Sequence, residues 1–172
     1  GRPPAGPILF AKGFAMLSRL LPRQADNAYR GHRVALWLFA IVVLLKTIMS
    51  VNSMINGRDI ASSADGIPLD TYTPDAARTV VSLFGGLGLS NFVICLLCIV
   101  VLARYRALIP LMFSVLLFQH LARKLMHQLM PVVTTGTPPG SAINLGLLVL
   151  MVAGLALSLW SRDKTAWEKP SK

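Results

Sequence analysis

Four long apolar blocks constrain the fold of this chain more than any other feature of its sequence. They cover Val34–Asn56, Thr79–Ala103, Ala107–Met130 and Ser141–Trp160. Each is close to the roughly 20 residues that an α-helix needs to cross about 30 Å of hydrocarbon. Only 14% of the residues are charged, against about 25% in a soluble domain. The sequence predicts an all-α polytopic membrane protein, folded as a four-helix transmembrane bundle with up-down-up-down topology.

The net charge of +10 is distributed unevenly over the segments between these blocks. Most Lys and Arg residues lie in 1–33, in 161–172 and in the turn at 104–106, whereas the other two connections hold only Arg58 and Arg78. By the positive-inside rule, both termini and this turn are expected in the cytoplasm. Loops 57–78 and 131–140 are then periplasmic or extracellular, in what we interpret as a bacterial inner (plasma) membrane. This distribution favours contacts with anionic lipid headgroups and predicts no nucleic-acid partner.

The basic arm 1–33 contains a candidate amphipathic helix at residues 8–21. Large apolar side chains repeat there at helical spacing, and Pro22 ends the pattern: Phe10, Phe14, Leu17 and Leu21. The pattern predicts a short helix lying in the membrane interface. The alternatives are a partly disordered arm or a helix packed on a neighbouring subunit.

The connection 58–78 is the only sizeable segment outside the membrane apart from the two tails. It carries four acids and no large apolar cluster, so we do not expect it to fold as an independent domain; the acids are Asp59, Asp65, Asp70 and Asp75. Its end, Thr73-Pro74-Asp75, is a plausible helix start, with an N-cap, a proline at the first helical position and an acid in the first turn.

Small and amide side chains indicate where the helices meet. Small residues at four-residue spacing allow close helix approach in lipid, and we expect five of them at packing positions: Ser82, Gly86, Ser90, Gly154 and Ser158. Five amide side chains are candidates for hydrogen bonds between helices: Asn52, Asn91, Gln119, Gln128 and Asn144. The tight turn at 104–106 predicts that the second and third helices form an antiparallel hairpin.

Five cations in the apolar blocks form the main candidate site. Four of them share an arc of about 100° on the third helix, and one comes from the first helix: His120, Arg123, Lys124, His127 and Lys46. At 1.5 Å per residue, His120 lies about 20 Å and His127 about 30 Å from the cytoplasmic edge, and Lys46 about 18 Å. Charges at such depths are costly and face protein or water rather than lipid.

Three interpretations of these cations are compatible with the sequence. The long side chains can snorkel to the outer headgroups while the acidic loop 58–78 neutralises them. They can form a site for an anionic or polar ligand, such as a lipid phosphate or a quinone head. They can also dock onto a partner subunit that supplies carboxylates.

Metal, redox and catalytic sites are not expected. His120 and His127 are about 10.5 Å apart on one helix, too far for one zinc ion, and His32 lies at the opposite face. Cys95 and Cys98 have the spacing of a redox dithiol, but their apolar surroundings predict unreactive thiols. No carboxylate lies within a block. The sequence thus predicts no cofactor, no metal and no catalytic residue.

The leading functional hypothesis is a non-enzymatic accessory or assembly subunit that packs against other integral membrane subunits of a larger complex. The alternative is a lipid- or quinone-binding or carrier protein that uses the cations in the outer half of the third helix. A membrane thiol redox protein at Cys95 and Cys98 is the third hypothesis. Membrane lipids and other integral membrane subunits are the expected partners.

Overall fold

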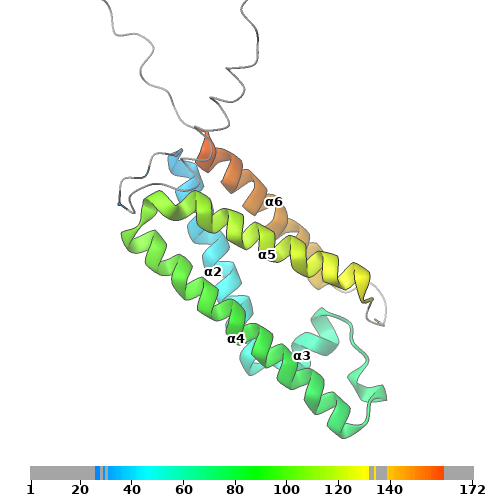
Figure 1. Ribbon diagram of the computed structural model, residues 1–172. Coiled ribbons are helices and arrows are strands. Elements are labelled where there is room, and N and C mark those ends of the chain that lie inside the picture. Colours follow the sequence, from blue (N-terminus) through cyan, green and yellow to red (C-terminus); the bar gives the residue numbers. More distant parts are fainter. Residues whose placement is uncertain (1–25, 28, 30, 132–133, 135–138, 161–172) are drawn as a thin grey trace, which may run out of the picture.

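The computed structural model describes residues 26–27, 29, 31–131, 134 and 139–160 (Figure 1). Within this part of the chain all regular structure is helical. The long helices are α2 (Arg33–Ile55), α4 (Pro74–Arg104), α5 (Ile109–Leu129) and α6 (Gly140–Leu159). All four are long and apolar enough to cross a membrane, where the span of α5 includes the short turn before it and covers Arg106–Leu129. The predicted all-α four-helix bundle is confirmed, whereas the predicted interfacial helix at 8–21 and the tail at 161–172 lie outside the described residues.

Local capping interactions fix where the helices begin. The Thr73 hydroxyl accepts a hydrogen bond from the Ala76 amide at 3.4 Å, and Pro74 is the first helical residue. The helix start read from Thr73-Pro74-Asp75 is therefore confirmed, and α4 begins at Pro74 rather than at Thr79. His32 caps α2 in the same way, because its Nδ1 accepts a hydrogen bond from the Val34 amide at 3.2 Å.

The helices pack in a different order from their order along the chain. We call the end where α2 begins and α6 ends the terminal end, and the opposite end the loop end. At the terminal end the His32 amide donates to the Leu157 carbonyl at 3.4 Å. Helix α2 packs along α4 and α6, and α5 packs mainly on α6. Helices α4 and α5 leave their shared turn together and then diverge toward the loop end (Figure 1), so the expected antiparallel hairpin is joined at the turn but is not packed along its length.

The main core lies in the terminal half of the bundle. Phe39 of α2 meets Phe113 of α5 edge-on, with ring centroids 5.0 Å apart and an interplanar angle of 71°. Each long helix contributes fully or nearly fully buried side chains: Phe39, Val42, Val43, Cys98, Val101, Ile109, Phe113, Leu116, Leu147 and Met151. Since these residues of α5 all precede Gln119, the core holds only the first half of α5.

The small residues divide into buried and exposed groups. Gly154 and Ser158 are buried, Gly154 against the ring of Phe113. Ser82, Gly86 and Ser90 are exposed, and a Cβ at Gly86 would meet nothing within 4 Å. The expectation that this stripe packs against another helix is corrected within the described chain. Helix α4 instead meets α2 at Gly88, where a Cβ would lie 2.9 Å from the Ser50 carbonyl oxygen, because four-residue spacing identifies a face but not its direction.

A second, smaller core lies at the loop end. Three short helical segments, α3 (Gly57–Asp59), η1 (Ile60–Ala64) and η2 (Leu69–Thr71), fold over the first turns of α4. Gly66, at φ 71°, allows the chain to turn between η1 and η2. The buried residues of this loop pack on apolar side chains of α4 and its lead-in: Ala61, Ile67 and Leu69 on Tyr72, Val80, Val81 and Phe84. The apolar residues of the loop are few, in agreement with the expectation that it holds no large apolar cluster, and α4 completes the small cluster that they form.

Candidate functional site

The structure brings together three of the five predicted cations. Lys46 of α2 and His120 of α5 are half-buried, and both lie within electrostatic range of Arg123. Lys124 also lies within electrostatic range of His120. His127 is exposed two turns further along α5. The result is a cationic cluster of Lys46, His120 and Arg123 between α2 and α5, extended toward the loop end by Lys124 and His127.

This cluster has no acidic counterpart in the part of the chain that the structure describes. No carboxylate there forms an ion pair with Lys46, Arg123 or Lys124; Asp70 pairs with Arg58 instead, at 3.4 Å. Asp65 of the loop lies next to the first residue of α6, because a Cβ on Gly140 would be 3.4 Å from Asp65 Oδ1. Neutralisation of the stripe by the acidic loop is therefore not found. The small core of Ala61, Ile67 and Leu69 holds the loop against α4, so Asp70 lies beside Arg58.

The loop-end half of α5, residues 121–130, is largely uncovered. Its apolar side chains are exposed, with Leu125 at 54% and Leu129 at 67%. Arg123, Lys124 and His127 on the other face are exposed as well. Since α4 has diverged and the core ends at Leu116, few residues of the described part of the chain pack on either face of the segment. It is a helix end that projects from its own bundle.

A single polar contact ties α5 to α4 where the two helices diverge. The Gln119 side-chain amide donates a hydrogen bond to Asn91 Oδ1 at 2.8 Å. The predicted hydrogen bonding between helices is confirmed for this pair. The second polar atom of Gln119, Oε1, is buried without a partner among the described residues, so this position retains hydrogen-bonding capacity next to His120.

The two cysteines are in the interior of the bundle. Cys95 and Cys98 are both buried as free thiols, and Cys98 belongs to the main core. A thiol must be accessible to react with a disulfide or a quinone. This arrangement gives the redox hypothesis no support. Within the described ranges no group of three or more His, Cys, Asp or Glu side chains is placed to hold a metal ion.

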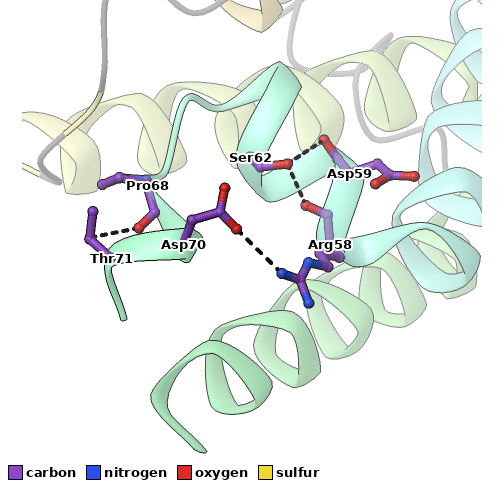
Figure 2. A network of polar contacts seen from close by, with 6 residues as sticks. All are labelled: Arg58, Asp59, Ser62, Pro68, Asp70 and Thr71. Atoms are coloured by element: carbon purple, nitrogen blue, oxygen red, sulfur yellow. Dashed lines mark hydrogen bonds and ion pairs between the residues drawn. The ribbon is translucent and has the colours of Figure 1, made fainter. Parts of the chain in front are cut away.

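A pocket at the loop end was not anticipated from the sequence. Arg58, Asp70 and Tyr72 from the loop and Arg78 from α4 line it together with apolar side chains. Figure 2 shows Arg58 reaching toward Asp70, with Ser62 donating to the Arg58 and Asp59 carbonyl oxygens. The sequence offered one indication of this pocket: Arg58 and Arg78 are the two basic residues in connections that otherwise lack Lys and Arg. The packing of α3 against α4 brings the two arginines to one pocket.

Comparison with known proteins adds no family to this description: no protein-family model matches the chain, and no curated protein or solved structure is significantly similar to it.

Proposed function

We propose that this protein is a non-enzymatic accessory subunit of a larger membrane complex, and that it docks onto another integral membrane subunit through residues 121–130 of α5. The observation that carries the proposal is that this segment is uncovered on both its apolar and its cationic face. Lipid already solvates the apolar face, but a neighbouring helix could supply the counter-charges that the cationic face lacks among the described residues.

The charges define the chemistry of the partner surface. A Lys or Arg at the centre of a membrane helix costs about 2.5–3.5 kcal/mol on insertion scales, and less near the interface. Arg123 and Lys124 have no carboxylate partner within the described chain. We therefore expect Asp or Glu on the partner helix, together with an apolar surface that covers Leu125 and Leu129. The same proposal places the protein in a bacterial inner membrane, with the terminal end cytoplasmic by the positive-inside rule.

Photo-crosslinking in native membranes tests this docking surface. A photoreactive amino acid at Leu125 should form a discrete adduct with one membrane protein. The same amino acid at Val93, an equally lipid-accessible position of α4 (50% exposed against 54% for Leu125), should not. A chain that crosslinks equally at both positions, or at neither, contradicts the proposal.

Charge reversal separates docking from folding. Arg123→Glu or Lys124→Glu should remove the partner from the complex purified in mild detergent, because losing one member of a desolvated ion pair costs about 2–5 kcal/mol. Arg104→Glu, at the terminal end of α4, makes the same charge change at the opposite end of the bundle from residues 121–130 and should retain the partner. A partner-free, monodisperse monomer from native membranes would overturn the proposal.

A second candidate function is binding of an anionic or polar amphiphile, such as a lipid or a quinone, at Lys46. The supporting observation is that Lys46 is half-buried beside Arg123 and His120 with no carboxylate partner in the described chain. Organic extraction of the purified protein should then recover a stoichiometric amphiphile. Lys46→Met should lose it while the partner subunit is retained, which distinguishes this function from docking.

A further inference from the structure

The pocket at the loop end has the geometry of an anion site that faces the membrane. It has a volume of about 650 Å³ and is open on one side. Two arginines line it from different elements, Arg58 from α3 and Arg78 from the second turn of α4. Arg binds phosphate and carboxylate oxygens bidentately through its planar guanidinium.

The length of α4 places this pocket at the headgroup level. Arg78 and Arg104 enclose an uncharged stretch of the helix, and at 1.5 Å per residue they are about 39 Å apart along it. A bilayer measures about 40–45 Å when its headgroup regions are included. When Arg104 lies at one headgroup layer, Arg78 and the pocket lie at the other.

A stripe of small residues on α4 extends from the pocket toward the apolar part of the helix. Ser82 lines the pocket and is the first residue of the exposed stripe that continues through Gly86 to Ser90. A Cβ at Gly85 or Gly86 would meet nothing within 4 Å. The stripe is about 12 Å long at 1.5 Å per residue, and its small side chains leave space beside α4 that an acyl chain could occupy.

We propose that this pocket binds an anionic phospholipid, with the phosphate between Arg58 and Arg78 and one acyl chain along Ser82, Gly86 and Ser90. Asp70 is the internal competitor for this anion. Its Oδ1 is 3.4 Å from Arg58 Nη2, and its side chain is 95% exposed, so it can move into water when a phosphate replaces it. The site lies on α3, η2 and α4 and does not depend on docking through α5.

Native mass spectrometry of the detergent-purified protein tests the headgroup site. Dioleoyl phosphatidylglycerol is expected to bind at least about tenfold more tightly than dioleoyl phosphatidylcholine. Both lipids present an anionic phosphate, but the choline ammonium of the zwitterion cancels its net charge and is repelled by the two arginines. Arg58→Gln and Arg78→Gln should each lower the phosphatidylglycerol affinity about tenfold. Arg104→Gln, an exposed arginine of the same helix, should leave it unchanged.

Asp70→Asn is the control for the possibility that the arginine variants lose affinity because they misfold. It removes the competing carboxylate, so the affinity for phosphatidylglycerol should rise, which an unfolded pocket cannot produce. Equal binding of the two lipids, or an Arg104→Gln loss equal to that of Arg78→Gln, would overturn the proposal.

The acyl-chain contact and the source of the phosphate are tested separately. Gly86→Leu fills the space beside α4 and should lower the phosphatidylglycerol affinity severalfold. Gly146→Leu, at an equally open glycine of α6, should not. Glycerol phosphate at millimolar concentration should fail to displace the lipid. Full displacement by glycerol phosphate together with an inert Gly86→Leu would show a site for a free phosphate and would overturn the lipid assignment.

Discussion

The same substitution at two glycines of α6 is expected to change stability in opposite directions. Gly154 and Gly146 both lie within the helix, but their surroundings differ. A Cβ at Gly154 would lie 2.6 Å from Cε1 and 3.1 Å from Cε2 of Phe113, whereas a Cβ at Gly146 would meet nothing within 4 Å. We predict that Gly154→Ala destabilises the bundle and that Gly146→Ala stabilises it.

The magnitudes follow from packing and backbone entropy. Phe113 is fully buried and packs edge-on to Phe39, so its ring has no free space into which to move. Overpacking of this kind costs about 1–3 kcal/mol, and replacing a helical Gly by Ala returns about 0.5–1 kcal/mol. Gly154→Ala should therefore lose about 1–2 kcal/mol, whereas Gly146→Ala gains only the second contribution.

Reversible unfolding in mixed detergent and sodium dodecyl sulfate, followed by circular dichroism, measures both free energies of unfolding. Phe113→Leu in the Gly154→Ala background provides the control, because a smaller side chain relieves the overlap and the two substitutions should couple favourably. A Gly154→Ala protein as stable as Gly146→Ala would refute the assignment of this contact.

Three further outcomes follow from the contacts of single residues. A double-mutant cycle on Asn91→Ala and Gln119→Ala, read by the same unfolding assay, should give a coupling of about 0.5–1.5 kcal/mol; no coupling would mean that the hydrogen bond contributes nothing. Burial raises the pKa of Tyr29 to about 12, so its contribution to stability is complete below pH 10 and is lost as the pH rises through 12; Tyr29→Phe should lack this alkaline loss in a pH series of melting temperatures. Thr73→Ala removes the N-cap of α4 and should cost about 0.5–1 kcal/mol; faster hydrogen exchange in residues 75–77 reports it, and Thr79→Ala, which leaves the cap intact, should not show it.

The sequence was sufficient for the helices and insufficient for their contacts. Apolar blocks of the required length identified the four long helices, and Thr73-Pro74 identified the start of α4, because these features depend on residues close together in the chain. The pairing of α5 with α6 rather than with α4 depends on how Phe39, Phe113 and Gly154 fit together. No local pattern contains that fit.

The candidate sites show the same limit. The cations of α5 were visible as a stripe, since helical geometry alone places them on one face. Neutralisation by the acidic loop, one of the three interpretations, is not found among the described residues, because a small core of Ala61, Ile67 and Leu69 holds that loop against α4. The same core creates the pocket of Arg58 and Arg78, whose guanidinium groups come from segments on either side of the loop.

Length and hydropathy along the chain therefore determined which helices are long and apolar enough to cross a membrane, because insertion depends on the free energy of each helix in its solvent. The tertiary structure alone decided which faces the described residues leave uncovered, among them the loop-end half of α5 and the Ser82–Ser90 face of α4. Inside a bilayer, lipid solvates an apolar helix face as well as another helix does, so helix pairing is decided by steric fit and a few polar contacts, which arise between residues distant in sequence.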